Sequence, residues 1–519
     1  MVWEGPRTQP AFFTPSIPGL ERRLRTNSPL TQLYRALRVL WVALTFPLHL
    51  SLVALLLVPV LPALLPDALV PGRKQRWTLP QRAVYPLLRR LIWAVCDVGS
   101  PNTLTPSDAR GVPLWARALE EFTVRVGGAA RVTVEVRDAA LPGQARREGW
   151  VKGDVLDPVG VIDFESVPCF WFERDGQGQG SAPAKAGARW RARNGEERVL
   201  VYFVGGGFVT GNPSEGSRCF KLARETGLRV VGANFRKATT PSQAFPAALQ
   251  DALTVYAHLV LDLGYRDVVL AGDSAGGSLA LMLTQYLATL CPRRPASLVL
   301  PSALLLLSPW SDLTASTYAV ASHSRFEDDI ICASMATNSI RSFLLHVNSP
   351  RVRKAFAARG QASDDNGPGR DSGDSVYALG AQHAFFSPAL PTALPSLTRT
   401  AQAYLAASRA APLRILVTTG SAELFHLEIV RLVDNLRAAS RAAVIDAGPS
   451  RGGGASGEVF EVELLSAEGE VHAFPLVPEW VSPAAGTAME KMREWALEGT
   501  GRDAREEKGR RGEADGAPQ

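Results

Sequence analysis

One short stretch constrains the fold of this chain more than any other: residues 272–277, which read Gly-Asp-Ser-Ala-Gly-Gly. An apolar run, 267–271, precedes it, and a helical pattern of leucine and alanine follows over 278–283. Where a strand turns directly into a helix, the backbone is packed too tightly for a Cβ at the positions two before and two after the serine, so both must be glycine. Such a turn lifts the Ser274 hydroxyl above the edge of a sheet, where it can act as a nucleophile. The alternative is a glycine-rich loop that only joins a strand to a helix.

A second glycine run lies upstream of this turn. Residues 198–204 read as a buried strand and run into Gly205, Gly206 and Gly207. Consecutive glycines leave backbone N–H groups unshielded, so a loop of this kind can present two donors to a developing oxyanion. Because a strand ends in this run and a serine turn follows it in the chain, we favour an oxyanion-binding loop over a flexible connection.

A serine becomes a useful nucleophile only when a base accepts its proton and an acid orients that base. In folds with this serine turn the chain order is serine, then acid, then histidine. The chain holds seven histidines, and His472 is the one that fits this order. It follows the strand-like run 459–465 directly, which predicts a place at the edge of the sheet.

The candidate acid is Glu423, in the loop after the strand-like run 413–418. Asp312 follows an earlier strand and is its main rival. Glu428 is predicted to lie one turn into the next helix and to face solvent. A loop carboxylate can also be only a solvated charge or a helix cap, so the sequence leaves the choice of acid open.

Together these motifs resemble the hormone-sensitive lipase-like group of α/β-hydrolases. The resemblance covers about 198–480, and the motifs arrive in the family's order. They are the serine turn, Asn234-Phe235-Arg236, Phe245-Pro246-Ala247-Ala248-Leu249-Gln250-Asp251, Ser308-Pro309-Trp310 and Glu470-Val471-His472-Ala473-Phe474.

Carried over residue by residue, the resemblance implies a serine hydrolase. Ser274 would be the nucleophile, His472 the base and Glu423 the orienting acid. The backbone N–H groups of Gly206, Gly207 and Ala275 would form the oxyanion hole. The implied reaction is hydrolysis of a hydrophobic short-chain ester through an acyl-enzyme, without a cofactor or a metal.

Three positions depart from the family pattern. Val204 stands where the glycine run usually begins with histidine, Glu423 replaces the usual aspartate, and His472 is followed by alanine where glycine is common. Membrane-anchored fungal steryl acetyl hydrolases and their relatives tolerate such variants, and the chain looks most similar to them. An acetylated sterol or lipid is therefore the expected substrate. The alternatives are a catalytically silent binding protein on a hydrolase scaffold and an amidase or formamidase.

Strand signals separated by amphipathic helical stretches predict an α/β fold, a mostly parallel central sheet with helices on both faces. A catalytic domain is expected over 198–499, with an insertion over 314–400 that suits a lid or cap. The polar segment 361–374 is predicted to be disordered. The expected strands are 198–204, 228–234, 267–272, 303–307, 413–418 and 459–466, and the expected helices include 243–263, 333–347 and 427–440.

The N-terminal part indicates a membrane. Residues 39–65 carry no formal charge and are enough to cross a hydrocarbon core of ~30 Å, so 39–66 is the expected anchor, as a single span or a monotopic insertion. The first 100 residues hold twelve Arg or Lys against four Asp or Glu, including the basic segment 1–38. This asymmetry favours an anionic lipid surface, and we expect the endoplasmic reticulum. Residues 75–197 are expected to contain interfacial or cap elements and leading strands.

The remaining composition excludes several classes of protein. The five cysteines are odd in number and scattered, which indicates neither a disulfide framework nor a zinc site. No basic module interleaved with aromatic residues is present, so nucleic acid is not an expected partner. The charged tail 500–519 is predicted to be disordered.

Overall fold

The computed structural model describes the chain between residues 77 and 498, with gaps. The predicted anchor 39–66, the segment 361–374 and the tail 500–519 lie outside the described residues. The longer described ranges are 109–151, 162–175, 197–215, 218–293, 297–314, 333–345, 383–407, 411–447 and 458–498, and shorter pieces include most positions of 77–92 and residues 190–192 and 329–331.

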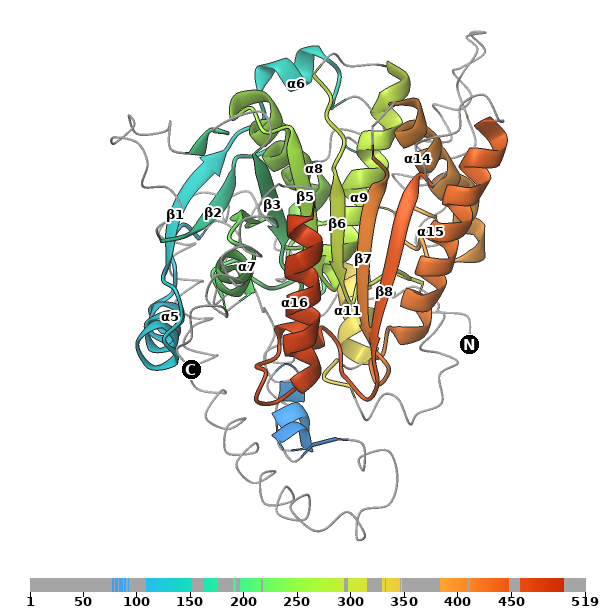
Figure 1. The fold of residues 1–519 in the computed structure, drawn as a ribbon. Coiled ribbons are helices and arrows are strands. Elements are labelled where there is room, and N and C mark those ends of the chain that lie inside the picture. The colour runs from blue at the N-terminus through green and yellow to red at the C-terminus, as the bar shows by residue number, and fades with distance from the viewer. Residues whose placement is uncertain are drawn as a thin grey trace, which may run out of the picture.

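A twisted sheet of eight strands forms the centre of the described structure (Figure 1). Its order is β1-β2-β4-β3-β5-β6-β7-β8. β2 runs in the opposite direction to the other seven strands, so the prediction of a mostly parallel sheet is confirmed. The strands are β1 (Val132–Ala139), β2 (Val167–Arg174), β3 (Arg198–Phe203), β4 (Arg229–Ala233), β5 (Asp267–Asp273), β6 (Ala303–Leu307), β7 (Leu413–Gly420) and β8 (Phe460–Ala467).

The central strands are buried on both faces, which is why they read as continuous apolar runs rather than alternating ones. Every residue of β6 and β4 is buried, and so is all of β3 and β5 after the first residue. The edge strand β8 is only half-buried, and its sequence alternates accordingly. Because the parallel strands all end at one edge, the loops that follow β3, β5, β6, β7 and β8 meet there.

Helices cover both faces of the sheet, as Figure 1 shows. One face carries α7 and α16, which contact each other, and the other carries α8, α9, α14 and α15. The bounds are α5 (Leu114–Gly127), α6 (Gly143–Arg147), α7 (Arg218–Thr226), α8 (Ala247–Ala257), α9 (Ala275–Leu290), α11 (Ala333–Phe343), α14 (Leu394–Ala406), α15 (His426–Ala447) and α16 (Pro483–Leu497).

The helix expected over 243–263 is shorter at its start than the sequence suggests. A 3-10 turn covers Pro241–Gln243, α8 begins only after Pro246, and the last turn, His258–Asp262, is a π-helix. A proline has no N–H to donate within a helix, so Pro246 sits at the N-cap instead. The segment 241–262 is long and apolar enough to cross a membrane, but 89% of its most apolar window is buried inside the protein, as in a core helix.

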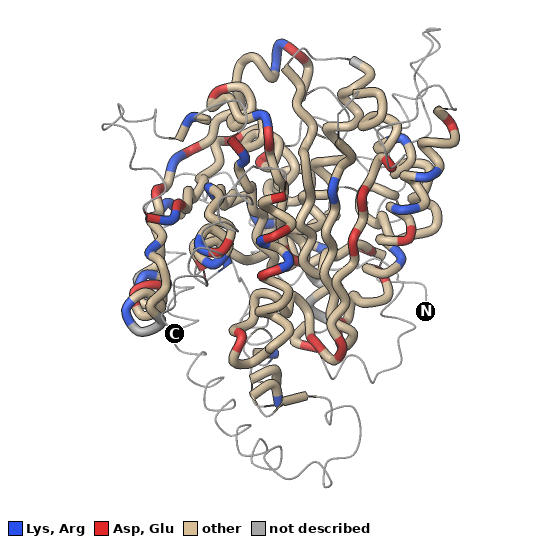
Figure 2. Tube along the Cα trace, in the orientation of Figure 1, with Lys and Arg blue, Asp and Glu red and all other residues tan. Residues whose placement is uncertain are grey.

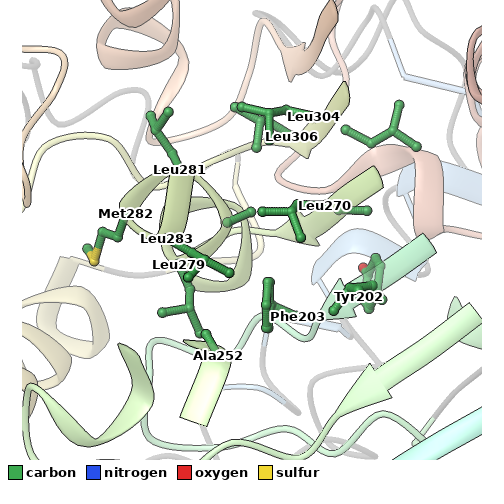
Figure 3. Close-up of a cluster of buried hydrophobic side chains, with 14 of the residues drawn as sticks. Tyr202, Phe203, Ala252, Leu270, Leu279, Leu281, Met282, Leu283, Leu304 and Leu306 are labelled. Carbon is green, nitrogen blue, oxygen red and sulfur yellow. The ribbon is translucent and has the colours of Figure 1, made fainter. Parts of the chain in front are cut away.

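The core extends over both faces of the sheet, and one layer of it lies between the sheet and α9 (Figure 3). Leu279 and Leu283 of α9 point toward Phe203 of β3 and Leu270 of β5, and all four side chains are buried. At about 1.5–3 kcal/mol for each fully buried side chain, this layer fixes the position of α9 on the sheet. The residue that precedes α9 is Ser274, so packing in the core places the serine turn.

Charged side chains lie on the outer elements. In Figure 2 the Lys and Arg positions are interspersed with the Asp and Glu positions over α5, α15 and α16, whereas β6 carries no charge. This distribution is typical of a domain whose central strands are buried on both faces.

Candidate active site

Ser274 occupies a strained turn between β5 and α9. Its φ of 53° and ψ of −123° lie where side chains other than glycine rarely go. Hydrogen bonds hold the backbone on both sides: Ser274 N donates to Leu307 O at 2.9 Å, and Trp310 N donates to Ser274 O at 3.1 Å. A Cβ at Gly272 would overlap the backbone of Gly276, so the predicted need for glycine is real.

Asp273, the residue before the serine, holds the glycine loop in place. Its Oδ1 accepts a hydrogen bond from Gly205 N at 2.8 Å and another from the Tyr202 hydroxyl at 2.6 Å. Its Oδ2 lies 3.8 Å from a guanidinium nitrogen of Arg218. No role was predicted for Asp273, but the structure shows that this residue of the serine motif holds the loop after β3.

The predicted oxyanion loop is built from glycines that a larger residue could not replace. Gly206 and Gly207 have φ values of 127° and 62°, and a Cβ on Gly206 would come 2.5 Å from Thr210 O. Within the described part of the chain, the N–H groups of Gly206, Gly207 and Ala275 donate no hydrogen bond. Val204, which stands where the family pattern has histidine, is buried.

His472 lies beside Glu423, in the loop after β8. Its Nδ1 is 3.2 Å from Glu423 Oε2, at ion-pair distance, although the two atoms are not aligned for a hydrogen bond. Glu423 is fully buried and its Oε1 accepts a hydrogen bond from the Thr419 hydroxyl. Such contacts are often loose without substrate and tighten in the reacting complex. The Nε2 atom of His472 is buried and bonds to no described residue, so it is free to take a proton.

The loops that carry Ser274 and His472 are tied to each other through the end of β6. Ser274 N donates to Leu307 O, and the next residue, Ser308, accepts a 2.9 Å hydrogen bond from Ala473 N at its Oγ. The serine, the histidine and the acid thus come from the ends of β5, β8 and β7, at one edge of the sheet.

Burial and charge act in opposite directions on His472. Burial lowers the pKa of its imidazole, while the carboxylates of Glu423, Asp329 and Asp273 raise it, and the net pKa lies above the ordinary 6.5. These carboxylates favour the imidazolium, which is the state that a general base reaches after taking a proton.

The rival acid, Asp312, is buried in a different environment. Its Oδ1 accepts a hydrogen bond from Thr314 N at 2.8 Å and one from the Thr314 hydroxyl, which closes a turn after β6. The prediction that Glu428 faces solvent was wrong. Glu428 is fully buried, and its Oε1 accepts hydrogen bonds from Ser311 N at 2.8 Å and Asp312 N at 3.2 Å. Two N–H groups of the loop after β6 point at the first turn of α15, and a carboxylate satisfies both.

The sequence reasoning missed a further buried carboxylate, Asp329, in the region of the expected insertion. Its oxygens accept hydrogen bonds from His472 N at 2.9 Å and Leu424 N at 2.8 Å, so it joins the loop of the base to the loop of the acid. Burial, and then the nearby Glu423, raise the pKa of Asp329 to about 6, although His472 and the two N–H groups act to lower it. No motif surrounds Asp329, so nothing in the local sequence marks it.

Aromatic rings pack beside the catalytic groups. The Phe208 ring stacks on Phe343 of α11 with centroids 3.8 Å apart, and Trp310 stacks on Phe425 at 5.4 Å. The edge of Phe425 meets the His472 ring at 5.0 Å. Because α11 belongs to the expected insertion 314–400, part of that insertion contributes apolar surface at this edge of the sheet.

Other candidate sites lie apart from these residues. A cavity of about 570 Å³ is lined by residues of β1, of β2 and of the π-helix, among them Trp171 and His258, and by Trp190 from the connection between β2 and β3. None of the candidate catalytic residues lines it. In the described ranges no group of three His, Cys, Asp or Glu side chains is arranged to hold a metal ion.

Comparisons with known proteins agree on the fold. Residues 200–366 match a family model described as an alpha/beta hydrolase fold. An acetyl-hydrolase of Streptomyces hygroscopicus is 36% identical over 130 residues, 24% of this chain and 40% of that protein. An ethyl acetate hydrolase of Pseudomonas putida is 37% identical over 112 residues, 20% of this chain and 31% of that protein. The chain thus spans less than half the length of these curated relatives.

A solved structure is similar over a longer span. The crystal structure of a hormone-sensitive lipase from a metagenome library aligns with 79% of this chain and 97% of its own, at 19% identity and a TM-score of 0.41.

Proposed function

We propose that the chain, whose residues 200–366 match a model of the alpha/beta hydrolase fold, is a serine hydrolase of carboxylic esters. Ser274 is the nucleophile, His472 the base and Glu423 the orienting acid. The observation that carries the proposal is the buried pair of Glu423 and His472, because it leaves Nε2 without a hydrogen-bond partner among the described residues, at the edge where Ser274 lies. A binding protein would have no need of a buried, charge-oriented imidazole.

The reaction follows from these positions. Ser274 Oγ attacks the ester carbonyl carbon while His472 Nε2 takes its proton, and the carbonyl oxygen becomes an oxyanion. The unshielded N–H groups of Gly206, Gly207 and Ala275 donate to it, and losing one such donor typically costs about 10²–10³ in rate. His472 returns its proton to the leaving alcohol as the carbon–oxygen bond breaks. A water molecule, deprotonated by His472, then attacks the acyl carbon, the bond to Ser274 Oγ breaks, the acid is released, and His472 returns the proton to Ser274 Oγ.

The substrate proposed is a short-chain ester of a bulky hydrophobic alcohol, such as an acetylated sterol or lipid. The rings of Phe208, Trp310 and Phe343 provide apolar surface beside the site. Two relatives carry names that refer to acetyl or acetate hydrolysis. The uncharged stretch 39–66 would hold the enzyme at a membrane, for which we propose the endoplasmic reticulum, and would bring it to such esters.

Turnover of p-nitrophenyl acetate, butyrate and laurate by detergent-purified protein tests this function. We expect hydrolysis of all three, with acetate or butyrate preferred to laurate, and covalent labelling by a fluorophosphonate probe. Folded protein that neither turns over an ester nor reacts with the probe would support the binding-protein alternative, for which Val204 is the one supporting feature. Hydrolysis of p-nitroacetanilide at a higher rate than the acetate ester would instead indicate an amidase.

The pH dependence of kcat/KM should reflect the effect of the neighbouring carboxylates on the pKa of His472. Because the base must be neutral, kcat/KM should rise with pH through the pKa of His472, which lies above 6.5. Asp329→Asn removes one of the charges that raise this pKa, so the acid limb of the profile should move to lower pH, with kcat about tenfold lower. The matched control is Glu173→Gln, a buried carboxylate that pairs with Arg229 on β4. An acid limb that stays in place in Asp329→Asn would contradict this role.

A further inference from the structure

The loop that carries His472 is held from outside the catalytic domain by residues 77–92, here called the N-terminal segment. Glu470, two residues before His472, has a buried carboxylate. Its Oε1 accepts a hydrogen bond from Gln81 Nε2 at 2.8 Å, and its Oε2 accepts one from the Tyr85 hydroxyl at 2.5 Å. Among the described residues, both side-chain partners of Glu470 come from this segment. A buried carboxylate without them would carry a large desolvation cost.

The sequence of the segment sets up these contacts. Thr78 and Gln81 form a capping box, in which Gln81 Oε1 accepts a 2.7 Å hydrogen bond from Thr78 N. Pro80 is helical and lies in the first turn, where its missing N–H would have no partner within the helix. Because the oxygen of the Gln81 amide caps the helix, its NH₂ group is left to point outward, toward Glu470.

An apolar cluster surrounds the contacts. Trp77 and Tyr85 meet edge to face, with centroids 5.2 Å apart, and Trp77 Nε1 donates to Gly469 O at 2.6 Å. In Figure 1 the segment lies next to the start of α16, at the edge of the sheet where the strands end. The cluster consists of Trp77, Tyr85, Val471, Val477 and Val481.

Glu470 also contacts the loop of the acid. Its backbone oxygen accepts a 3.0 Å hydrogen bond from Ala422 N, next to Glu423. Gly420 approaches the same carbonyl so closely that a Cβ there would overlap it. A displacement of Glu470 would therefore shift His472 and Glu423 relative to each other and to Ser274.

We propose that the N-terminal segment is part of the catalytic centre, with Gln81 and Tyr85 as positioning residues that fix His472 through Glu470. This role rests on the proposed hydrolase function. The segment follows the predicted anchor 39–66 after only ten residues, so the element nearest the membrane also sets the geometry of the base.

A charge swap in the full-length protein tests the proposal. Gln81→Glu keeps an oxygen for the capping box but turns a second carboxylate toward Glu470. It should lower kcat for p-nitrophenyl acetate and the rate of fluorophosphonate labelling by about 10–100-fold, with KM little changed, because a misplacement of about 1 Å at the reacting centre costs up to about 10² in rate. Adding Glu470→Gln, which restores a donor and acceptor pair, should return kcat to within about threefold of the original. Tyr85→Phe should lower kcat less than Gln81→Glu does.

The matched control is Tyr256→Phe, which removes a buried hydroxyl that donates to Val299 O at 2.7 Å, away from His472.

Hydrogen exchange gives a second measurement that does not depend on activity. Amides of residues 467–477 should exchange faster in Gln81→Glu than in the original protein and recover in the double variant. Unchanged exchange in this stretch, or a kcat that falls only with the folded fraction, overturns the proposal. If the original protein itself has no turnover and no labelling, the hydrolase function fails, and the exchange data still decide whether the segment holds the His472 loop.

Discussion

Replacing Ser274 by alanine is expected to abolish ester hydrolysis, lowering kcat by about 10⁶-fold, since loss of the nucleophile in a catalytic triad removes the covalent route altogether. Labelling by a fluorophosphonate should disappear as well. The substitution deletes only one oxygen from a residue held by backbone hydrogen bonds to Leu307 and Trp310, so the fold should survive. Far-UV circular dichroism and the melting temperature check this.

Ser302→Ala is the matched control for this prediction. Ser302 precedes β6, and its Oγ donates to Asp267 and to Val268 O at the start of β5, the end of that strand remote from Ser274. It should keep wild-type turnover. Residual activity above one part in a thousand in Ser274→Ala, from protein free of contaminating esterase, would mean that another group carries the reaction.

The second large effect separates the two candidate acids. Glu423→Gln should lower kcat by about 10⁴-fold, because an amide can hold the imidazole in the wrong tautomer and cannot stabilise the imidazolium. Asp312→Asn should lower kcat less than about tenfold, because one amide oxygen can still accept from Thr314 and keep the turn after β6 closed. Both variants are compared at saturating p-nitrophenyl acetate. The reverse order of the two losses would assign the orienting acid to Asp312.

The strands of the catalytic domain could be predicted to within one or two residues at most ends. Runs such as the one over β6 are apolar at every position because both faces of the sheet are covered, and this signal is local. The ends of α8 were less predictable, because a proline at the N-cap and a π-turn at the other end overrode the apolar pattern. Residues 1–76 remain outside the described structure, and the predicted anchor there stays a prediction.

The candidate site was predictable where a motif encodes it. The glycine spacing predicts Ser274 as the nucleophile and the order in the chain predicts His472 as the base, and both stay predictions. Asp329 and Glu428 could not be found this way, because their roles arise from backbone N–H groups of loops about 100 residues or more away. A helical sequence pattern predicts that a carboxylate in the first turn faces solvent, and this is why Glu428 was predicted to lie on the surface. The loop that packs against this turn, with N–H groups that need an acceptor, is far away in the sequence.

The docking of the N-terminal segment also constrains the order in which parts of the protein fold. Tyr85 precedes its partner Glu470 by 385 residues, so during synthesis Trp77 and Tyr85 exist long before the loop that covers them. Contacts of such high sequence separation form late in folding, because a long chain must first be closed. The sheet and α9 can assemble from nearer neighbours, whereas the histidine loop reaches its final geometry only when residues 77–85 meet residues 469–481. On this view, the position of the candidate base is fixed last, in a protein that is already largely folded.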